Sequence, residues 1–199
     1  AIAQGRAVRR TTARPGDILL VSGTLGDSGL GLRLREQPEL AAEFGLDTKH
    51  AEALVARYLR PAPRLALATH LPSLATAAMD VSDGLVKDCG RMARASGVGV
   101  TIEAERIPLS PAFRVALGRR PAVLEVALTG GDDYEVLAAV APADAADFRR
   151  VAGESGVVVS AVGQVAEGSG VTVVGRDGRP LELTSPGWDH FPDPPRFRP

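Results

Sequence analysis

Short apolar runs and amphipathic helical stretches follow one another along this chain in an irregular order, and this order constrains the fold most. Residues 17–22 (DILLVS) form an apolar run after a Pro-Gly turn, which predicts a buried strand. The glycine-rich segment 23–29 follows, and Leu30 and Leu34 then recur at near-helical spacing. Because strands and helices are mixed without strict alternation, the sequence predicts an α/β (α+β) domain with a mixed sheet flanked by helices.

The remaining elements are predicted from the same periodicities. Thr48 is expected to cap a helix that ends at Arg60, since the residue before a proline avoids the helical region. A second helix is expected to begin near 80–83 and to end at Gly97. The other predicted elements are a connector with a short helix at 61–74, strands at 98–103, 123–129 and 134–140 (the last two as a hairpin or strand–turn–strand), a helix at 142–152, and strands at 157–162, 171–174 and 181–183.

Composition limits the class of protein and the kinds of partner. The 199 residues carry a net charge of −1, with 24% charged and 45% hydrophobic residues, which suits a globular chain with one sizeable core. We expect one domain over 17–199, preceded by a polar, Arg-rich arm over 1–16 that serves as a linker. The balanced charge argues against a nucleic-acid partner. The sequence contains no run of roughly 18 apolar residues, so no membrane span is predicted. The single cysteine, Cys89, excludes an internal disulfide, fits a reducing compartment such as the cytoplasm, and is expected to fill the core.

The segment 79–85 (MDVSDGL) is the first candidate for chemistry. It places Asp80, Ser82 and Asp83 at an expected helix start, where the helix dipole favours ionised carboxylates. Ionised oxygens with room for water are what Mg²⁺ takes beside substrate phosphates, and Ser82 could donate to a phosphate. The alternative is that Asp80 or Ser82 only caps the helix, with Asp83 in its first turn.

Two glycine-rich segments are further candidates. In 128–135 (LTGGDDYE), paired glycines would let the backbone approach a ligand beside Asp132 and Asp133. The alternative is a hairpin turn with solvated charges. The segment 23–29 (GTLGDSG) could cradle a phosphate, although it lacks both the Gly-Lys-Ser/Thr of a Walker A loop and the spacing of a dinucleotide fingerprint.

The segment 187–191 (GWDHF) is the fourth candidate. Trp188 could stack on a flat heteroaromatic ring, or it could pin the C-terminus to the core together with Phe191. Other arginines, such as Arg91 and Arg149, are interpreted as parts of solvated faces. No spacing suggests a Ser-His-Asp or Cys-His catalytic set or a zinc site.

Taken in order, these segments and the stretch 58–64 (YLRPAPR) resemble the thiamine-monophosphate kinase family over roughly residues 5 to 191. Aminoimidazole ribonucleotide synthetase, selenophosphate synthetase and the hydrogenase-maturation dehydratase share that family's fold, and the ending GWDHF favours the thiamine kinases among them. The resemblance implies the C-terminal domain of the aminoimidazole ribonucleotide synthetase-like fold. It also implies a cytoplasmic enzyme of thiamine biosynthesis, which uses ATP to phosphorylate thiamine phosphate to thiamine diphosphate, with Mg²⁺ ions bridging the two anionic partners.

The same resemblance implies roles for individual residues. The implied roles are Mg²⁺ ligation by Asp80 and Asp83, a contact to ATP by Ser82, and contacts to the thiamine substrate by Asp132, its neighbour Asp133 and Trp188. Many members carry Glu where this chain has Asp132. No general base is implied, because the acceptor phosphate is already anionic at neutral pH.

Family members carry an N-terminal domain ahead of the position of Gly5, with most of the metal-binding aspartates, much of the ATP site and the dimer interface. We expect that domain to be missing from this chain, so the chain alone is expected to be inactive, and the whole enzyme to be a homodimer through that domain. A surface that faces it is expected to be unusually apolar. The competing interpretations are another ATP-dependent enzyme of the same superfamily, with a different acceptor, and a non-catalytic ligand- or metal-binding module.

Overall fold

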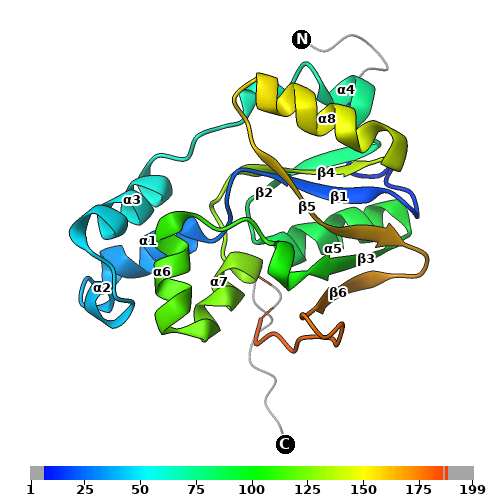
Figure 1. Ribbon diagram of the computed structural model, residues 1–199. Helices are drawn as coiled ribbons and strands as arrows, with labels where there is room; N and C mark the ends of the chain where they lie inside the picture. The colour runs from blue at the N-terminus through cyan, green and yellow to red at the C-terminus, as the bar shows by residue number, and fades with distance from the viewer. Residues whose placement is uncertain (1–6, 186, 188–199) are drawn as a thin grey trace, which may run out of the picture.

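The computed structural model describes residues 7–185 and 187, which form a mixed six-stranded sheet surrounded by helices (Figure 1). The strands are β1 (Ile18–Ser22), β2 (Ala77–Val81), β3 (Gly99–Glu103), β4 (Glu135–Val140), β5 (Val159–Ala166) and β6 (Gly170–Val174). The α-helices are α1 (Asp27–Glu36), α2 (Leu40–Glu43), α3 (Thr48–Leu59), α4 (Leu71–Leu74), α5 (Leu85–Ser96), α6 (Pro111–Arg119), α7 (Leu124–Thr129) and α8 (Pro142–Glu154). Short 3₁₀ turns are η1 (Leu65–Leu67), η2 (Ala104–Arg106) and η3 (Pro121–Val123).

The strand order is β2-β4-β1-β5-β3-β6, and the sheet is mixed, as predicted. Strands β4 and β5 run antiparallel to their neighbours, whereas β6 pairs with β3 in parallel. Strands β1, β2, β3 and β6 therefore point the same way. Their carboxyl ends lie at one end of the sheet, together with the amino ends of β4 and β5.

Strand β1 is central, and both of its faces are buried. Leu19 and Val21 belong to the larger hydrophobic cluster on the side of α5, whereas Leu20 packs in a smaller cluster with Phe148 of α8. Successive side chains of a strand point to opposite faces, so burial of both faces requires an uninterrupted apolar run. The strand predicted at 17–22 is confirmed as β1, and burial of both faces explains its apolar sequence.

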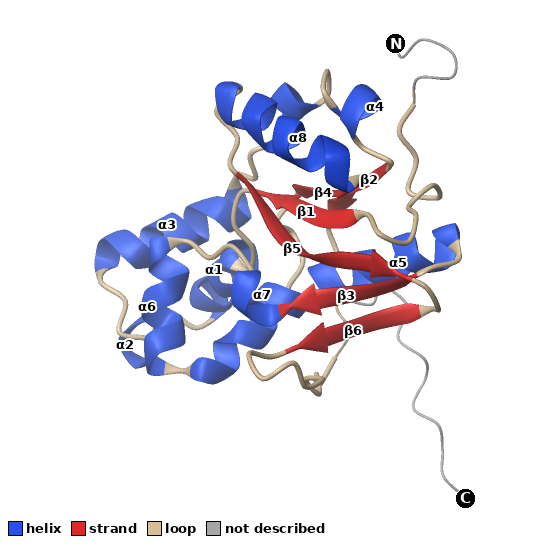
Figure 2. Ribbon diagram, turned by 45° about the vertical axis from the view of Figure 1, so that its right-hand side comes forward, coloured by secondary structure: helices blue, strands red, loops and turns tan. Residues whose placement is uncertain are grey.

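Helices cover both faces of the sheet and one of its ends. Helix α5 lies on one face, α8 and α4 lie on the other, and α1, α2, α3, α6 and α7 gather beyond the end where β1, β2, β3 and β6 finish (Figure 2). Helix α5 buries Leu85, Cys89 and Met92 and ends at Gly97 in the left-handed conformation, as predicted. Cys89 is fully buried, which confirms it as a core residue.

The helix start expected near 80–83 is wrong. Residues Ala77–Val81 form strand β2, which pairs antiparallel with β4 and places Asp80 opposite Val136. Helix α5 begins only at Leu85, after a turn. The composition Ala-Ala-Met is compatible with a helix, and pairing with β4 decides for a strand.

The strand expected at 123–129 is also wrong, and with it the hairpin over 123–140. Residues Leu124–Thr129 form helix α7. Val126, Ala127 and Leu128 are buried in succession because this short helix packs between α1 and α5, whereas a half-buried strand would bury every second residue. The strand predicted at 134–140 is confirmed as β4.

Further differences concern the cap of α3, the strand expected at 181–183, and two helices without a sequence prediction. The cap of α3 is Asp47, whose carboxylate accepts the N–H of His50, and not Thr48. Within the described residues no strand forms at 181–183, where the chain makes only a single bridge through Pro180. Helix α2 and helix α6, the latter capped by the Ser110 hydroxyl, were not predicted.

The described part of the N-terminal arm lies along the β2 edge of the sheet. The Ala78 N–H donates to the carbonyl of Arg9 (3.3 Å), and the Thr12 hydroxyl donates to the carbonyl of Thr76 (2.6 Å). The Ser96 hydroxyl at the end of α5 donates to the carbonyl of Arg10 (3.1 Å). None of the helices in the described ranges has the length and hydropathy needed to cross a membrane.

Candidate functional site

The segments 79–85 and 128–135 meet at the carboxyl end of β2. The N–H of Asp132 donates to the carbonyl of Ser82 (2.9 Å), and the N–H of Tyr134 donates to the carbonyl of Val81 (2.8 Å). A Cβ on Gly131 would lie 2.6 Å from the Ser82 carbonyl oxygen, so glycine is required for this approach. The fold therefore joins the first two sequence candidates into one site through backbone contacts.

Three carboxylates and one phenol form what we call the acidic face: Asp80, Asp83, Asp132 and Tyr134. Asp80 is exposed on the edge strand β2, and Tyr134 is exposed with a positive φ of 51°. The Tyr134 hydroxyl donates to Asp132 Oδ1 (3.2 Å). The negative charge of Asp132, with smaller contributions from Asp80 and Asp83, raises the pKa of Tyr134. The four groups therefore share one electrostatic environment.

A buried carboxylate of α5 holds the turn that carries Ser82 and Asp83. The N–H groups of both residues donate to Asp88 Oδ2, each at 2.9 Å, and Arg91 pairs with Asp88 (2.6 Å) and with Asp83. Burial is the main cause that raises the pKa of Asp88, and the two N–H bonds and Arg91 act against it. The solvated interpretation of Arg91 is wrong, because its guanidinium is ion-paired with two aspartates.

The capping interpretation of Asp80 and Ser82 is wrong as well. The N-cap residue of α5 is Gly84, and no side chain of the N-cap position accepts an N–H of the first turn. Gly84 has a φ of 106°, and a Cβ there would lie 2.5 Å from the Thr129 carbonyl oxygen. This glycine lets the turn after β2 pack against the end of α7.

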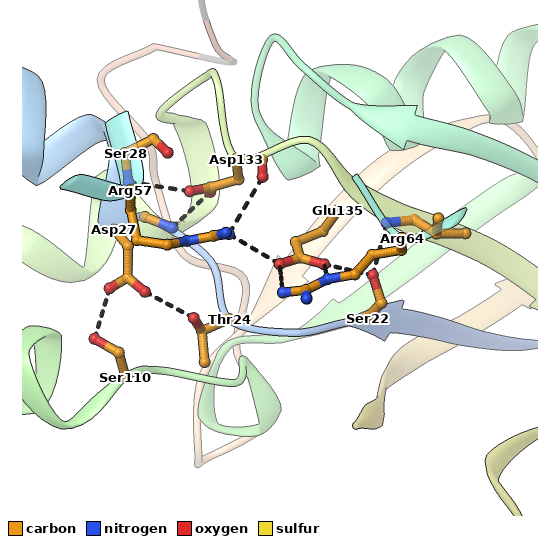
Figure 3. A network of polar contacts seen from close by, with 11 residues as sticks. Ser22, Thr24, Asp27, Ser28, Arg57, Arg64, Ser110, Asp133 and Glu135 are labelled. Atoms are coloured by element: carbon orange, nitrogen blue, oxygen red, sulfur yellow. Dashed lines mark hydrogen bonds and ion pairs between the residues drawn. The ribbon is translucent and has the colours of Figure 1, made fainter. Parts of the chain in front are cut away.

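Asp133 points away from the acidic face and into the core. Its Oδ2 accepts the N–H of Gly26 (2.6 Å) and its Oδ1 accepts the N–H of Ser28 (3.2 Å), at the N-terminus of α1 (Figure 3). Burial raises the pKa of Asp133 to about 7, against the opposing effect of the two N–H bonds. The glycine-rich segment 23–29, considered as a phosphate cradle, thus holds an internal carboxylate with its N–H groups.

Glu135, the first residue of β4, is the centre of a buried ion-pair network (Figure 3). Arg64 binds both carboxylate oxygens (2.6 Å each), Arg57 binds Oε1 (2.9 Å), and the Ser22 hydroxyl donates to Oε2 (2.6 Å). A Cβ on Gly23 would lie 2.1 Å from Glu135 Oε1, so the backbone passes directly over this carboxylate. The network fixes β1, β4, α3 and the connector after α3 relative to one another.

The network's residues were not predicted as a site from the sequence. Arg64 stands in the segment 58–64 and Glu135 in 128–135, which were both singled out, but no spacing relates them to Ser22 or Arg57. A buried carboxylate needs cationic partners, and only the fold shows which arginines supply them. Trp188, predicted to contact the thiamine substrate, lies outside the described residues.

A largely apolar groove of about 650 Å³ opens beside the acidic face. Leu65, Leu71 and Met79 contribute apolar surface, and Asp80 and Tyr134 stand at its polar end. Leu65 is 77% exposed, which is unusual for a leucine. The groove places apolar surface next to the carboxylates.

The donor chemistry of the acidic face fits Mg²⁺ in part. Carboxylate oxygens are the ligands that Mg²⁺ prefers, and Asp80 is exposed enough to offer them. Asp83 is already paired with Arg91. Among the residues with described positions, no group of three or more His, Cys, Asp or Glu side chains is arranged to hold a metal ion. Water, phosphate oxygens or other parts of a longer protein would have to complete a shell.

Comparison with known proteins shows which family this chain resembles. The family model described as AIR synthase related protein, C-terminal domain, matches residues 14–176. A thiamine-monophosphate kinase from Caulobacter vibrioides is 42% identical over 192 residues, which are 94% of this chain and 51% of that protein. The chain thus spans about half the length of the curated relatives it matches.

Solved structures show the same likeness. A thiamine-monophosphate kinase from Stenotrophomonas maltophilia superimposes with a TM-score of 0.80 at 38% identity, over 90% of this chain and 56% of that one. A structure described as AaThiL complexed with AMPPCP and TMP superimposes with a TM-score of 0.75 at 37% identity, over 94% of this chain and 55% of that one. Since the family model covers most of the chain, and the mixed sheet with its flanking helices is the fold of these structures, the chain belongs to the AIR synthase related family and contains its C-terminal domain.

Proposed function

We propose that this chain supplies the C-terminal half of an enzyme that uses ATP to phosphorylate thiamine phosphate to thiamine diphosphate. The observation that carries the proposal is the junction of segments 79–85 and 128–135, which brings Asp80, Asp83 and Asp132 into the electrostatic environment of Tyr134, beside an apolar groove that Asp80 and Tyr134 line. The relatives named thiamine-monophosphate kinase, and the related structure with AMPPCP and TMP, support the same reaction.

The acidic face suits the binding of two phosphorylated substrates through metal ions. Asp80 and Asp83 would hold Mg²⁺, and Ser82, between them, would contact ATP. When bound, Mg²⁺ would neutralise the negative charge of the donor and acceptor phosphates. Phosphoryl transfer depends mainly on positioning and charge neutralisation, and an anionic acceptor phosphate needs no general base.

Asp132 would contact the thiamine substrate, with Trp188 packing against its thiamine part. Asp132 is partly exposed and its carboxylate accepts a hydrogen bond from the hydroxyl of Tyr134, a residue that lines the groove. Asp133 is buried, and both of its oxygens accept N–H groups at the start of α1. We assign to Asp133 the task of holding the loop that presents Asp132.

The rest of the proposed enzyme lies beyond this chain. We propose that residues 1–16 link the domain 17–199 to an N-terminal domain that supplies further metal ligands and part of the ATP site. That domain would also form the homodimer interface of a cytoplasmic enzyme. The chain by itself would then lack kinase activity, because Mg²⁺ needs about six ligands and the described residues offer only part of that shell.

The test is kinase activity in a full-length protein that contains this chain. Asp80→Asn should raise the Mg²⁺ concentration for half-maximal rate by at least about 10–100-fold, the loss typical when only a hydrogen-bond partner of a metal ligand is removed. The matched control is Asp147→Asn on the exposed face of α8. Asp132→Asn should raise the KM for thiamine phosphate and leave the KM for ATP unchanged. Wild-type Mg²⁺ dependence in Asp80→Asn, or no conversion of thiamine phosphate by the unaltered protein, would refute the proposal.

A further inference from the structure

A second cavity lies at the same end of the sheet as the acidic face, beyond the network of Glu135. It has a volume of about 620 Å³. Its walls come from the segment after β1, from η2 and the loop that follows it, and from the turn between α8 and β5. In the strand order β2-β4-β1-β5-β3-β6, these segments flank β1, β5 and β3, whereas the acidic face belongs to β2 and β4.

Four arginines line this cavity, which we call the basic cavity: Arg57, Arg64, Arg106 and Arg114. Among the residues that line the cavity, only Glu105 carries a carboxylate. The other carboxylates that act on these arginines are Glu135, which pairs with Arg57 and Arg64, Glu103, which pairs with Arg106 (2.7 Å), and Asp27 and Asp133, which act on Arg57. The lining that a ligand would meet therefore presents four guanidinium groups and one carboxylate.

Two arginines of the basic cavity, Arg57 and Arg64, are held in place before any ligand arrives. Fully buried Glu135 fixes Arg64 through Nε and Nη2 and Arg57 through Nη2. The Arg114 Nε donates to the carbonyl of Leu109 (3.1 Å). A guanidinium has five N–H donors, so these bonds leave donors on each group to face the cavity. Arginine held in this way binds phosphate oxygens in pairs, and little entropy is lost on binding.

We propose that the basic cavity binds the phosphate group of a small molecule, at a site distinct from the acidic face. The complementary chemistry is a tetrahedral oxyanion with two negative charges. Its source is either free inorganic phosphate or the phosphate of a small metabolite. This proposal does not rest on the proposed kinase activity, because it follows from the arginines and the cavity alone.

The first measurement is calorimetric titration of the whole 199-residue chain with inorganic phosphate at constant ionic strength. Arg106→Gln and Arg114→Gln remove charges whose side chains are exposed, so the fold should be retained. Each should weaken phosphate binding by about tenfold or more, the equivalent of about 1.4 kcal/mol for a lost charge-assisted hydrogen bond. Arg149→Gln, on the exposed face of α8, is the matched control and should bind like wild type. Circular dichroism checks that each variant is folded.

A second measurement locates the site without any substitution. Phenylglyoxal modifies accessible arginines, and mass spectrometry identifies them. Phosphate should protect Arg106 and Arg114 and leave Arg149 reactive. The proposal is overturned if phosphate does not bind, if Arg106→Gln and Arg114→Gln bind as tightly as the control, or if phosphate protects neither arginine.

The source of the phosphate is identified by repeating the titration with thiamine phosphate and with ATP in the absence of Mg²⁺. A ligand that binds more tightly than inorganic phosphate, and loses that advantage in Arg114→Gln, would be the metabolite whose phosphate enters the cavity. Equal or weaker binding of both would identify free phosphate as the ligand. Failure of the kinase test would leave this result unaffected, since no turnover is measured.

Discussion

Replacement of the buried carboxylate of Asp133 should change how the stability of the protein depends on pH. Asp133 is 1% exposed, and burial raises its pKa from 3.8 to about 7, although the N–H groups of Gly26 and Ser28 act in the opposite direction. At pH values between these two, the folded chain keeps a proton that the unfolded chain has lost. Stability therefore falls as the pH rises from about 4 to about 7.

The size of this effect follows from the shift. For each pH unit between the two pKa values, the unfolding free energy of wild type falls by about 1.4 kcal/mol. Over the whole range from 3.8 to about 7 the loss is about 4 kcal/mol. Asp133→Asn cannot ionise and has no such dependence. It offers one acceptor oxygen where Asp133 offers two, so it should be no more stable than wild type near pH 4. As the pH rises from about 4 to about 7, the unfolding free energy of Asp133→Asn should therefore increase relative to that of wild type, by up to about 4 kcal/mol.

The assay is urea unfolding followed by circular dichroism at a series of pH values, for both proteins. Asp47→Asn is the control, because Asp47 caps α3 from an exposed position and the His50 N–H lowers its pKa. A cap of that kind stabilises above its unfolded pKa and loses its effect as the pH falls, so the control should show the opposite trend. If the bonds from Gly26 and Ser28 outweigh burial, wild type will gain on Asp133→Asn as the pH rises, which would refute the reasoning.

Two further predictions concern packing at the site and in the core. Gly84→Ala should destabilise the fold by about 1–3 kcal/mol in the same urea assay, because φ is 106° and the new Cβ would lie 2.5 Å from a carbonyl oxygen; Gly118→Ala, with nothing within 4 Å, should cost little. The Cys89 thiol should react with a thiol reagent only as fast as the protein unfolds, since it is fully buried and burial raises its pKa; fast labelling under native conditions would contradict this.

Local sequence was sufficient to predict an element where one short segment has a clear hydrophobic pattern. The run 17–22 is predicted as a strand because it is apolar without interruption, as burial of both of its faces requires. The end of α5 at Gly97 is predicted because apolar residues recur at helical spacing up to that glycine. The segment Leu124–Thr129 was wrongly predicted as a strand, because its β-branched and apolar residues suit a buried strand and a buried helix alike. Its contacts with α1 and α5 decided between them.

The candidate site shows the same division. The motifs that contain Asp80, Ser82, Asp83 and Asp132 were visible in the sequence, because closely spaced glycines and aspartates are rare outside turns and sites. That Asp132 is partly exposed beside Tyr134 while its neighbour Asp133 is buried could not be predicted, since adjacent residues differ only through the backbone conformation of the loop.

The sequence by itself determined the mixed α/β class, most of the strands and helices, and the family to which the chain belongs. Those properties depend on hydrophobic periodicity and on motifs that are local in the chain. Only the tertiary structure decided that the two acidic segments meet, that Arg57 and Arg64 clamp Glu135, and that four arginines surround one cavity. The physical reason is that charge pairing, burial and pKa shifts depend on distances between atoms, and folding brings together residues whose separation along the chain carries no signal.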